Sequence, residues 1–183
     1  MKKKVLKRTA AVILAALLVL NCFTGAALAD EITEPVVVAY GEHVTIRDDI
    51  NVTNESVAVC VAAGYPEKSL EVIGNVSLTN DFGYSSAVYV EAGDGNATAI
   101  ITGSVSAKAQ DFINALEIRR NRPLSGGTAT IKVSDNVSAE SKTLAYGVDS
   151  NYGVVDVGGN VTAKAEENDG HACGMPACPM WNV

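Results

Sequence analysis

The sequence has few aromatic residues, few histidines and no recognisable catalytic constellation. Aromatic side chains make up only 5% of its 183 residues, so a core must be built mainly from Val, Ile, Leu and Ala. A core of this kind suits narrow stacked layers of strands better than a helical bundle. No stretch after residue 29 repeats its apolar residues with the 3.6-residue period of an amphipathic helix. These absences point away from a helical protein.

Basic residues are also scarce once the N-terminal segment is set aside. Residues 1–29 hold five of the 14 Lys and Arg and none of the 21 Asp and Glu. The remaining chain therefore has nine basic residues against 21 acidic ones, a net charge of −12. Such an acidic chain is a poor candidate for binding nucleic acid or an anionic membrane. Its 154 residues are enough for one domain with a sizeable core.

The N-terminal segment, residues 1–29, is predicted to be a secretory signal peptide of bacterial appearance. A charged start at Lys2–Arg8 precedes an apolar stretch at Ala10–Leu20, and Ala27-Leu28-Ala29 is a small-x-small cleavage site. We therefore expect a mature chain that begins at Asp30 and is secreted or held at the cell surface. The apolar stretch is too short for a membrane anchor, because a spanning helix needs about 20 apolar residues.

Lipid attachment is the alternative to simple cleavage. The residues before Cys22 loosely match a lipobox, but Asn21 is a poor residue immediately before a lipidated Cys. A good cleavage site also lies downstream, so simple cleavage is favoured. The mature chain contains no second hydrophobic segment and no sortase-type motif, and we expect no transmembrane segment in it.

One short phrase occurs five times and dominates the mature sequence. Each copy has a Gly or Asp at its centre, with apolar residues two and four positions before and after it and mostly polar residues between. This period-2 alternation is typical of a strand with one buried face. The central residue has the parity of an inward position but is small, which predicts a corner with no room for a large side chain. The five corner residues are Asp48, Gly74, Gly103, Asp135 and Gly159.

A second phrase follows each corner and predicts a third strand. It consists of a small residue, an apolar residue and an outward residue, as in Ala115-Leu116-Glu117. The corners are 26, 29, 32 and 24 residues apart, so the strands are constant and the insertions fall in loops. One unit cannot bury its apolar face alone, whereas stacked units bury a continuous core. The sequence therefore predicts an all-β fold of about five irregular rungs.

The repeated phrase, apolar-x-apolar-x-Gly-Asn-Val-Ser/Thr-Ala followed by Ala/Gly-Val-x-Val, resembles the rungs of secreted bacterial parallel β-helix (β-solenoid) proteins. These include adhesin-like and autotransporter-passenger-like surface proteins and pectate-lyase-like enzymes. The resemblance covers about residues 44–177. It implies right-handed winding, as does the crossover rule for parallel strands. It does not imply one activity, because a fold does not determine function.

The predicted domain organisation has a solenoid at residues 44–177 with a short segment on each side. Residues 30–43 are expected to form an N-terminal strand or a cap, because an uncovered terminal rung exposes unpaired backbone groups. Residues 178–183 form a tail of different composition. The tail is either an end plug, with Trp181 over the last rung, or the end of a truncated reading frame.

Two carboxylates are the nearest approach to a catalytic pair. Glu117 and Asp149 share an outward position on neighbouring units, and Arg119 and Arg120 follow Glu117. Glycoside hydrolysis uses two carboxylates that flank the bond, and a stacked pair about 5 Å apart is geometrically feasible. The favoured interpretation is a solvated rim with ion pairing, in which water keeps both groups ionised and ordinary.

Two functions follow from these observations. The favoured one is a secreted non-enzymatic surface or adhesion module that binds a glycan or a cell-surface protein without a cofactor. The alternative is a small polysaccharide lyase or glycoside hydrolase of the β-helix type. Tyrosines on a flat side or in loops supply amphipathic contact area for binding. The candidate binding residues are Tyr84, Tyr89, Tyr146, Tyr152, Glu117, Asp149, Arg119 and Arg120, and no catalytic residue is assigned.

Cysteine and histidine do not predict a metal site. The sequence His171-x-Cys173-x4-Cys178 lacks a fourth ligand and matches no standard zinc spacing. A disulfide between Cys173 and Cys178 is allowed in an oxidising compartment and would fix the tail, leaving Cys60 as a free thiol. Incidental thiols are the alternative.

Overall fold

A computed structural model describes residues 31–38, 42–62, 67–81, 83–120, 126–167 and 170–174. The predicted signal peptide, Cys178 and Trp181 lie outside these residues, as does the side chain of Arg120. The described part of the chain contains sixteen strands and no helix.

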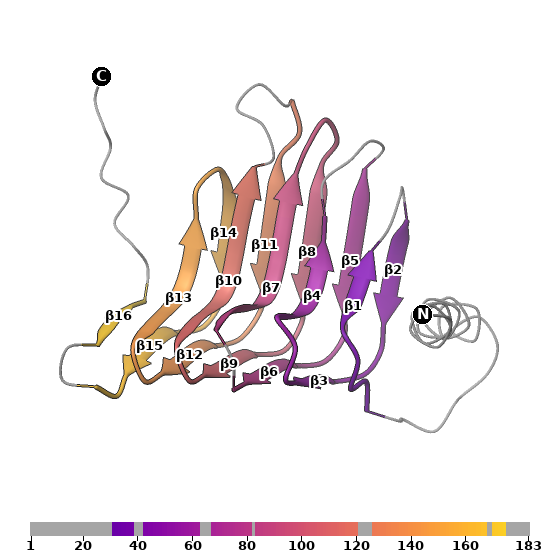
Figure 1. The fold of residues 1–183 in the computed structure, drawn as a ribbon. Helices are drawn as coiled ribbons and strands as arrows, with labels where there is room; N and C mark the ends of the chain where they lie inside the picture. Colours follow the sequence, from indigo (N-terminus) through magenta and orange to yellow (C-terminus); the bar gives the residue numbers. More distant parts are fainter. Residues whose placement is uncertain are drawn as a thin grey trace, which may run out of the picture. The chain divides into compact units, whose positions relative to one another are not determined.

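The strands form three parallel sheets (Figure 1). Sheet 1 consists of β1 (Val36–Val38), β4 (Val57–Val61), β7 (Tyr84–Ala92), β10 (Phe112–Arg120), β13 (Leu144–Ser150) and β16 (His171–Cys173). Sheet 2 consists of β2 (His43–Ile46), β5 (Lys68–Val72), β8 (Ala97–Ile101), β11 (Ala129–Val133) and β14 (Gly153–Val157). Sheet 3 consists of β3 (Ile50–Thr53), β6 (Val76–Asn80), β9 (Val105–Ala109), β12 (Val137–Ser141) and β15 (Val161–Ala165). Each strand pairs with the strand three places away in the chain, so the chain coils as a parallel β-solenoid. The predicted all-β class and parallel solenoid architecture are confirmed.

The repeat aligns as the alternation predicted. In sheet 3, Val137 is paired with Val105 on one side and with Val161 on the other. Val137 is fully buried, whereas Ser138, the next residue, is half-buried on the outer side. The core is therefore a continuous stack of Val, Ile, Leu and Ala enclosed by the three sheets.

The corner residues lie between sheets 2 and 3, where one strand ends and the next begins. Despite the inward parity of their spacing, Gly74 and Gly103 are only half-buried and Asp135 is exposed, so these positions do not belong to the core. What restricts their size is the neighbouring corner. A Cβ atom on Gly103 would lie 2.6 Å from the carbonyl oxygen of Gly74 and 2.5 Å from Oδ1 of Asn75.

Asn side chains join one corner to the next. The Oδ1 atom of Asn75 accepts a hydrogen bond from the backbone N–H of Ser104, at 2.9 Å. The Oδ1 atom of Asn136 accepts one from the N–H of Asn160 at the same distance. These bonds satisfy backbone donors that lie outside the strand ladders, which explains why Asn recurs beside the corner residue.

Gly103→Ala is expected to lower the free energy of unfolding by about 1–3 kcal/mol, because the corner backbone must shift to accept the methyl group. Gly126→Ala is the matched control, since a Cβ atom there has nothing within 4 Å. Urea denaturation of both variants measures the difference. Equal midpoints would show that the corners do not stack as closely as described.

Candidate functional site

The strands of sheet 1 change their alternation at one small residue. Ile113 and Leu116 both point into the core and are fully buried, although residues three apart in a regular strand face opposite sides. Ala115 is skipped in the pairing of β10 with its neighbours. The same position is skipped in the neighbouring strands, at Ala58, Ala87 and Gly147. This break is a bulge-like feature that redirects side chains. As a result, Asn114 and Glu117 both lie on the outer side of β10.

Six side chains from β7, β10 and β13 form a hydrogen-bonded group that we call the polar cluster. Its members are Tyr84, Ser86, Asn114, Glu117, Arg119 and Asp149. Register brings them together across three adjacent strands, because Glu117 is paired with Asp149 and Asn114 is paired with Ser86. The cluster therefore joins segments of the chain that are about thirty residues apart.

Glu117 is the buried centre of the polar cluster. Its Oε1 atom accepts a hydrogen bond from Nε of Arg119 at 2.6 Å, and its Oε2 atom accepts one from the hydroxyl of Ser86. Arg119 also donates from Nη2 to Oδ2 of Asp149, at 2.8 Å. One guanidinium thus bridges the two stacked carboxylates.

Glu117 differs from the solvated rim residue that its outward position predicts. It is only 2% exposed, and side chains of Ser86 and Arg119 lie against its two carboxylate oxygens. Asp149 does reach solvent, with 22% of its side chain exposed. Burial disfavours the charge on Arg119, but its hydrogen bond to Tyr84 and the charge of Glu117 outweigh that effect and raise the pKa of the guanidinium.

Tyr84 covers the polar cluster from the first residue of β7. Its hydroxyl oxygen accepts hydrogen bonds from Nδ2 of Asn114, at 2.8 Å, and from Nη2 of Arg119, at 3.3 Å. Burial and a hydrogen bond with Glu117 raise the pKa of the Tyr84 phenol, and Arg119 opposes the shift. The side chain nevertheless remains 47% exposed, so it lies between the buried polar groups and solvent.

A row of three aromatic rings runs across the same strands. Phe112 lies between Tyr84 and Tyr146 in edge-on contacts, with ring centroids 4.6 Å and 5.6 Å apart. Phe112 and Tyr146 are half-buried. Tyr89 is aligned with Glu117 on the neighbouring strand, and burial together with Glu91 raises the pKa of its phenol. Sheet 1 therefore presents aromatic rings beside hydrogen-bonding groups.

The remaining candidates are not among the six side chains of the polar cluster. Tyr152 is 64% exposed in the turn between β13 and β14. Cys60 and Cys173 are free thiols, and the Cys173–Cys178 disulfide stays a prediction because Cys178 lies outside the described residues. Among the residues that the structure describes, no group of three or more His, Cys, Asp or Glu is placed to hold a metal ion.

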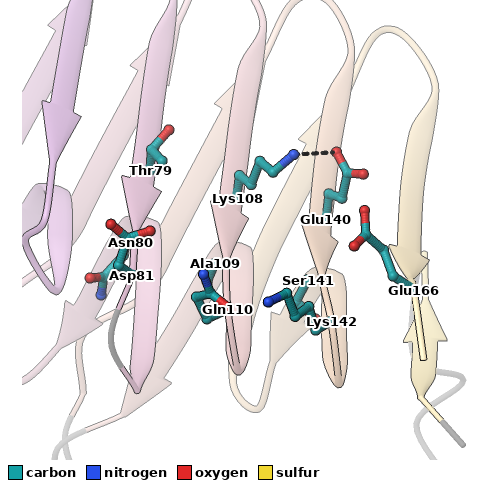
Figure 2. A pocket seen from close by; sticks show the side chains of 10 residues that line it. All are labelled: Thr79, Asn80, Asp81, Lys108, Ala109, Gln110, Glu140, Ser141, Lys142 and Glu166. Atoms are coloured by element: carbon teal, nitrogen blue, oxygen red, sulfur yellow. Dashed lines mark ion pairs between the residues drawn. The ribbon is translucent and has the colours of Figure 1, made fainter.

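Figure 2 shows a hollow at the end of sheet 3, on another part of the solenoid. Its volume is about 80 Å³, room for a few water molecules. A more open hollow of about 470 Å³ adjoins it over the outer face of sheet 3 and shares Thr79, Lys108 and Glu140 with it. The ion pairs beside it join Glu140 to Lys108 and Lys164, and both lysine side chains are more than 60% exposed. Exposed pairs of this kind are screened by solvent, so the hollow has little of the chemistry that sheet 1 offers.

Three residues of this site were missed by the sequence reasoning: Ser86, Asn114 and Phe112. Ser86 and Asn114 directly precede the small residue of the second phrase, and that position was the available signal.

The described residues contain no helix that is long and apolar enough to cross a membrane. No family model, curated protein or solved structure matches this chain.

Proposed function

We propose that this protein is a secreted, non-enzymatic β-solenoid that binds a glycan at a bacterial cell surface through the outer face of sheet 1. The observation that carries the proposal is the aromatic row placed beside the polar cluster. Secretion follows from the predicted signal peptide at residues 1–29. The surface role follows from the resemblance of the repeats to adhesin-like β-helix proteins.

Glycan recognition combines two kinds of contact that sheet 1 supplies. Aromatic rings pack against the apolar faces of sugar rings, and a few fixed polar groups bind the hydroxyls. Tyr84 and Tyr146 provide the rings, while the exposed part of the Arg119 guanidinium provides a donor. The cluster crosses three parallel strands spaced by about 4.8 Å, so it is extended enough to meet more than one sugar.

The arrangement of the carboxylates supports binding rather than catalysis. A general acid must carry a proton and deliver it to the leaving group. Both oxygens of Glu117 already accept hydrogen bonds, and Arg119 also holds Asp149. These contacts stabilise two fixed anions around one cation, a structural ion-pair network rather than an acid and base facing an open substrate position.

Binding of the mature chain to immobilised neutral and acidic polysaccharides tests the proposal. Tyr146→Ala is expected to weaken binding at least ~10-fold, because an aromatic contact of the row is lost. Tyr152→Ala is the matched control, since Tyr152 lies in the bend after β13 and is not part of the aromatic row, and its affinity should equal that of the wild type. Thermal midpoints of both variants separate loss of binding from loss of fold.

Two results would contradict the proposal. One is the absence of binding to every polysaccharide. The other is release of reducing ends or unsaturated products by the wild-type chain, with turnover lost in Glu117→Gln or Asp149→Asn. The second result would favour the polysaccharide-degrading alternative.

A further inference from the structure

Asn114 has a buried acceptor without a partner. The residue is fully buried, and its Nδ2 atom donates to the hydroxyl of Tyr84 at 2.8 Å. Its Oδ1 atom has no hydrogen-bond partner in the described structure. Buried polar atoms are nearly always paired in native proteins. An unpaired acceptor within a polar cluster near the surface therefore indicates a position where a ligand's hydroxyl can donate.

The Tyr84 hydroxyl is held by two neighbouring side chains of the polar cluster. It accepts hydrogen bonds from two donors, Nδ2 of Asn114 and Nη2 of Arg119. The ring is about half exposed and touches the edge of Phe112, so it is not part of the solenoid core. Gly83, directly before it, has a φ of 50°, and a Cβ atom built on it would meet nothing within 4 Å.

We infer that Tyr84 is an internal competitor for this position, and that a vicinal diol of an uncharged sugar binds by displacing its phenol. The inference rests on the proposed glycan-binding function. One sugar hydroxyl replaces the phenol, accepts from Asn114 and Arg119, and donates to Glu117 as the phenol did. The adjacent hydroxyl donates to the unpaired Oδ1 of Asn114. A diol thus satisfies one more buried atom than Tyr84 does, and this difference favours exchange.

The charges of the cluster select an uncharged sugar. Glu117 and Asp149 supply two carboxylates, and Arg119 supplies one guanidinium that is already bound to both. A uronate would bring a third negative charge close to this pair, and like charges in a partly buried site repel. Neutral hexoses are therefore the expected ligands, and acidic polysaccharides are not.

The test is the affinity of Tyr84→Phe for cellotetraose, mannotetraose and galactotetraose, with tetragalacturonate as the charged comparison. The variant keeps the ring but removes the competing oxygen. Because the wild-type site is open for only part of the time, removing the competitor is expected to lower the Kd for a neutral tetraose by ~3- to 10-fold. Tyr152→Phe, the matched control, should leave the Kd unchanged.

A spectroscopic signal reports the displacement itself. Binding to the wild type should move one phenol towards water and give a tyrosine difference spectrum in the near ultraviolet. The part of this spectrum that Tyr84 contributes should be absent from Tyr84→Phe, in which only the smaller contribution of Tyr146 remains. The difference spectrum compares only the wild type with Tyr84→Phe. It therefore remains informative even if proteins with substitutions at the buried Asn114 fail to fold.

The outcomes separate this inference from the proposed function. If the wild type binds a neutral tetraose and Tyr84→Phe binds it more weakly or equally, Tyr84 is not a competitor and the inference is overturned alone. Preference for tetragalacturonate would overturn the choice of an uncharged ligand. If neither protein binds any of the four sugars, the proposed function and the inference both fail.

Discussion

Val137→Asp is expected to lower the free energy of unfolding by about 3–5 kcal/mol, because it places an unpaired carboxylate in the core. Val137 is fully buried and is stacked between Val105 and Val161, all in the same inward column. The apolar surroundings offer the new charge neither water nor a counterion. Chemical denaturation followed by far-ultraviolet circular dichroism measures the change.

Ser138→Asp is the control for that substitution, one residue further along β12. Ser138 lies on the outer side, paired with the exposed residues Ser106 and Thr162. Its change in unfolding free energy should stay within about 0.5 kcal/mol. If both variants lost equal stability, the alternation of sheet 3 would be misassigned.

Arg119→Ala is expected to have the second-largest effect, a loss of about 2–3 kcal/mol of unfolding free energy. It leaves Glu117 buried without its guanidinium partner and also frees Asp149. The value is set below that of a fully buried pair because one third of the Arg119 side chain is exposed, so water can replace part of the lost contact. Thermal and chemical denaturation give the measurement.

The double variant Arg119→Ala with Glu117→Gln shows whether the loss comes from the unpaired charge. Because the amide is neutral, the double variant should be more stable than Arg119→Ala alone. Lys164→Ala removes an ion pair of similar length, at 2.9 Å to Glu140, from an exposed site. That control should leave the unfolding midpoint unchanged. A midpoint shift in Lys164→Ala as large as that in Arg119→Ala would argue against a special role for the buried network.

The sequence predicts the solenoid well because stacking repeats the same local pattern in each unit. The columns that contain Val105, Val137 and Val161 are visible as period-2 alternation, and the structure pairs them as expected. The stacking of Glu117 on Asp149 follows from the same alignment. Winding hand, export and the Asp30 start of the mature chain stay predictions.

The burial of Glu117 could not be predicted from alternation. A two-residue period marks Glu117 as outward, and it is outward, but side chains from other units, such as Ser86, lie against it. Ser86 and Tyr84 come from about thirty residues away in the chain. Their approach depends on register between units and on side-chain length, neither of which a single strand pattern contains.

The corner residues show a second limit of inferring burial from strand alternation. Alternation places Gly74 and Gly103 inward, which suggests that the interior restricts their size. The structure places them at a corner, where the carbonyl group of the preceding corner lies too close for a Cβ atom. The small residue was predicted correctly, but the physical reason is contact between backbones of neighbouring rungs.

The most direct test of the central claim is a nuclear magnetic resonance titration of the isotope-labelled mature chain with neutral tetrasaccharides. Binding through sheet 1 predicts that the amide signals of Ser86, Asn114 and Glu117 shift with added sugar. The signals of Ser106 and Ser138 on the outer face of sheet 3 should stay in place. Shifts concentrated on sheet 3, or no shifts with any of the sugars, would contradict a glycan-binding face on sheet 1.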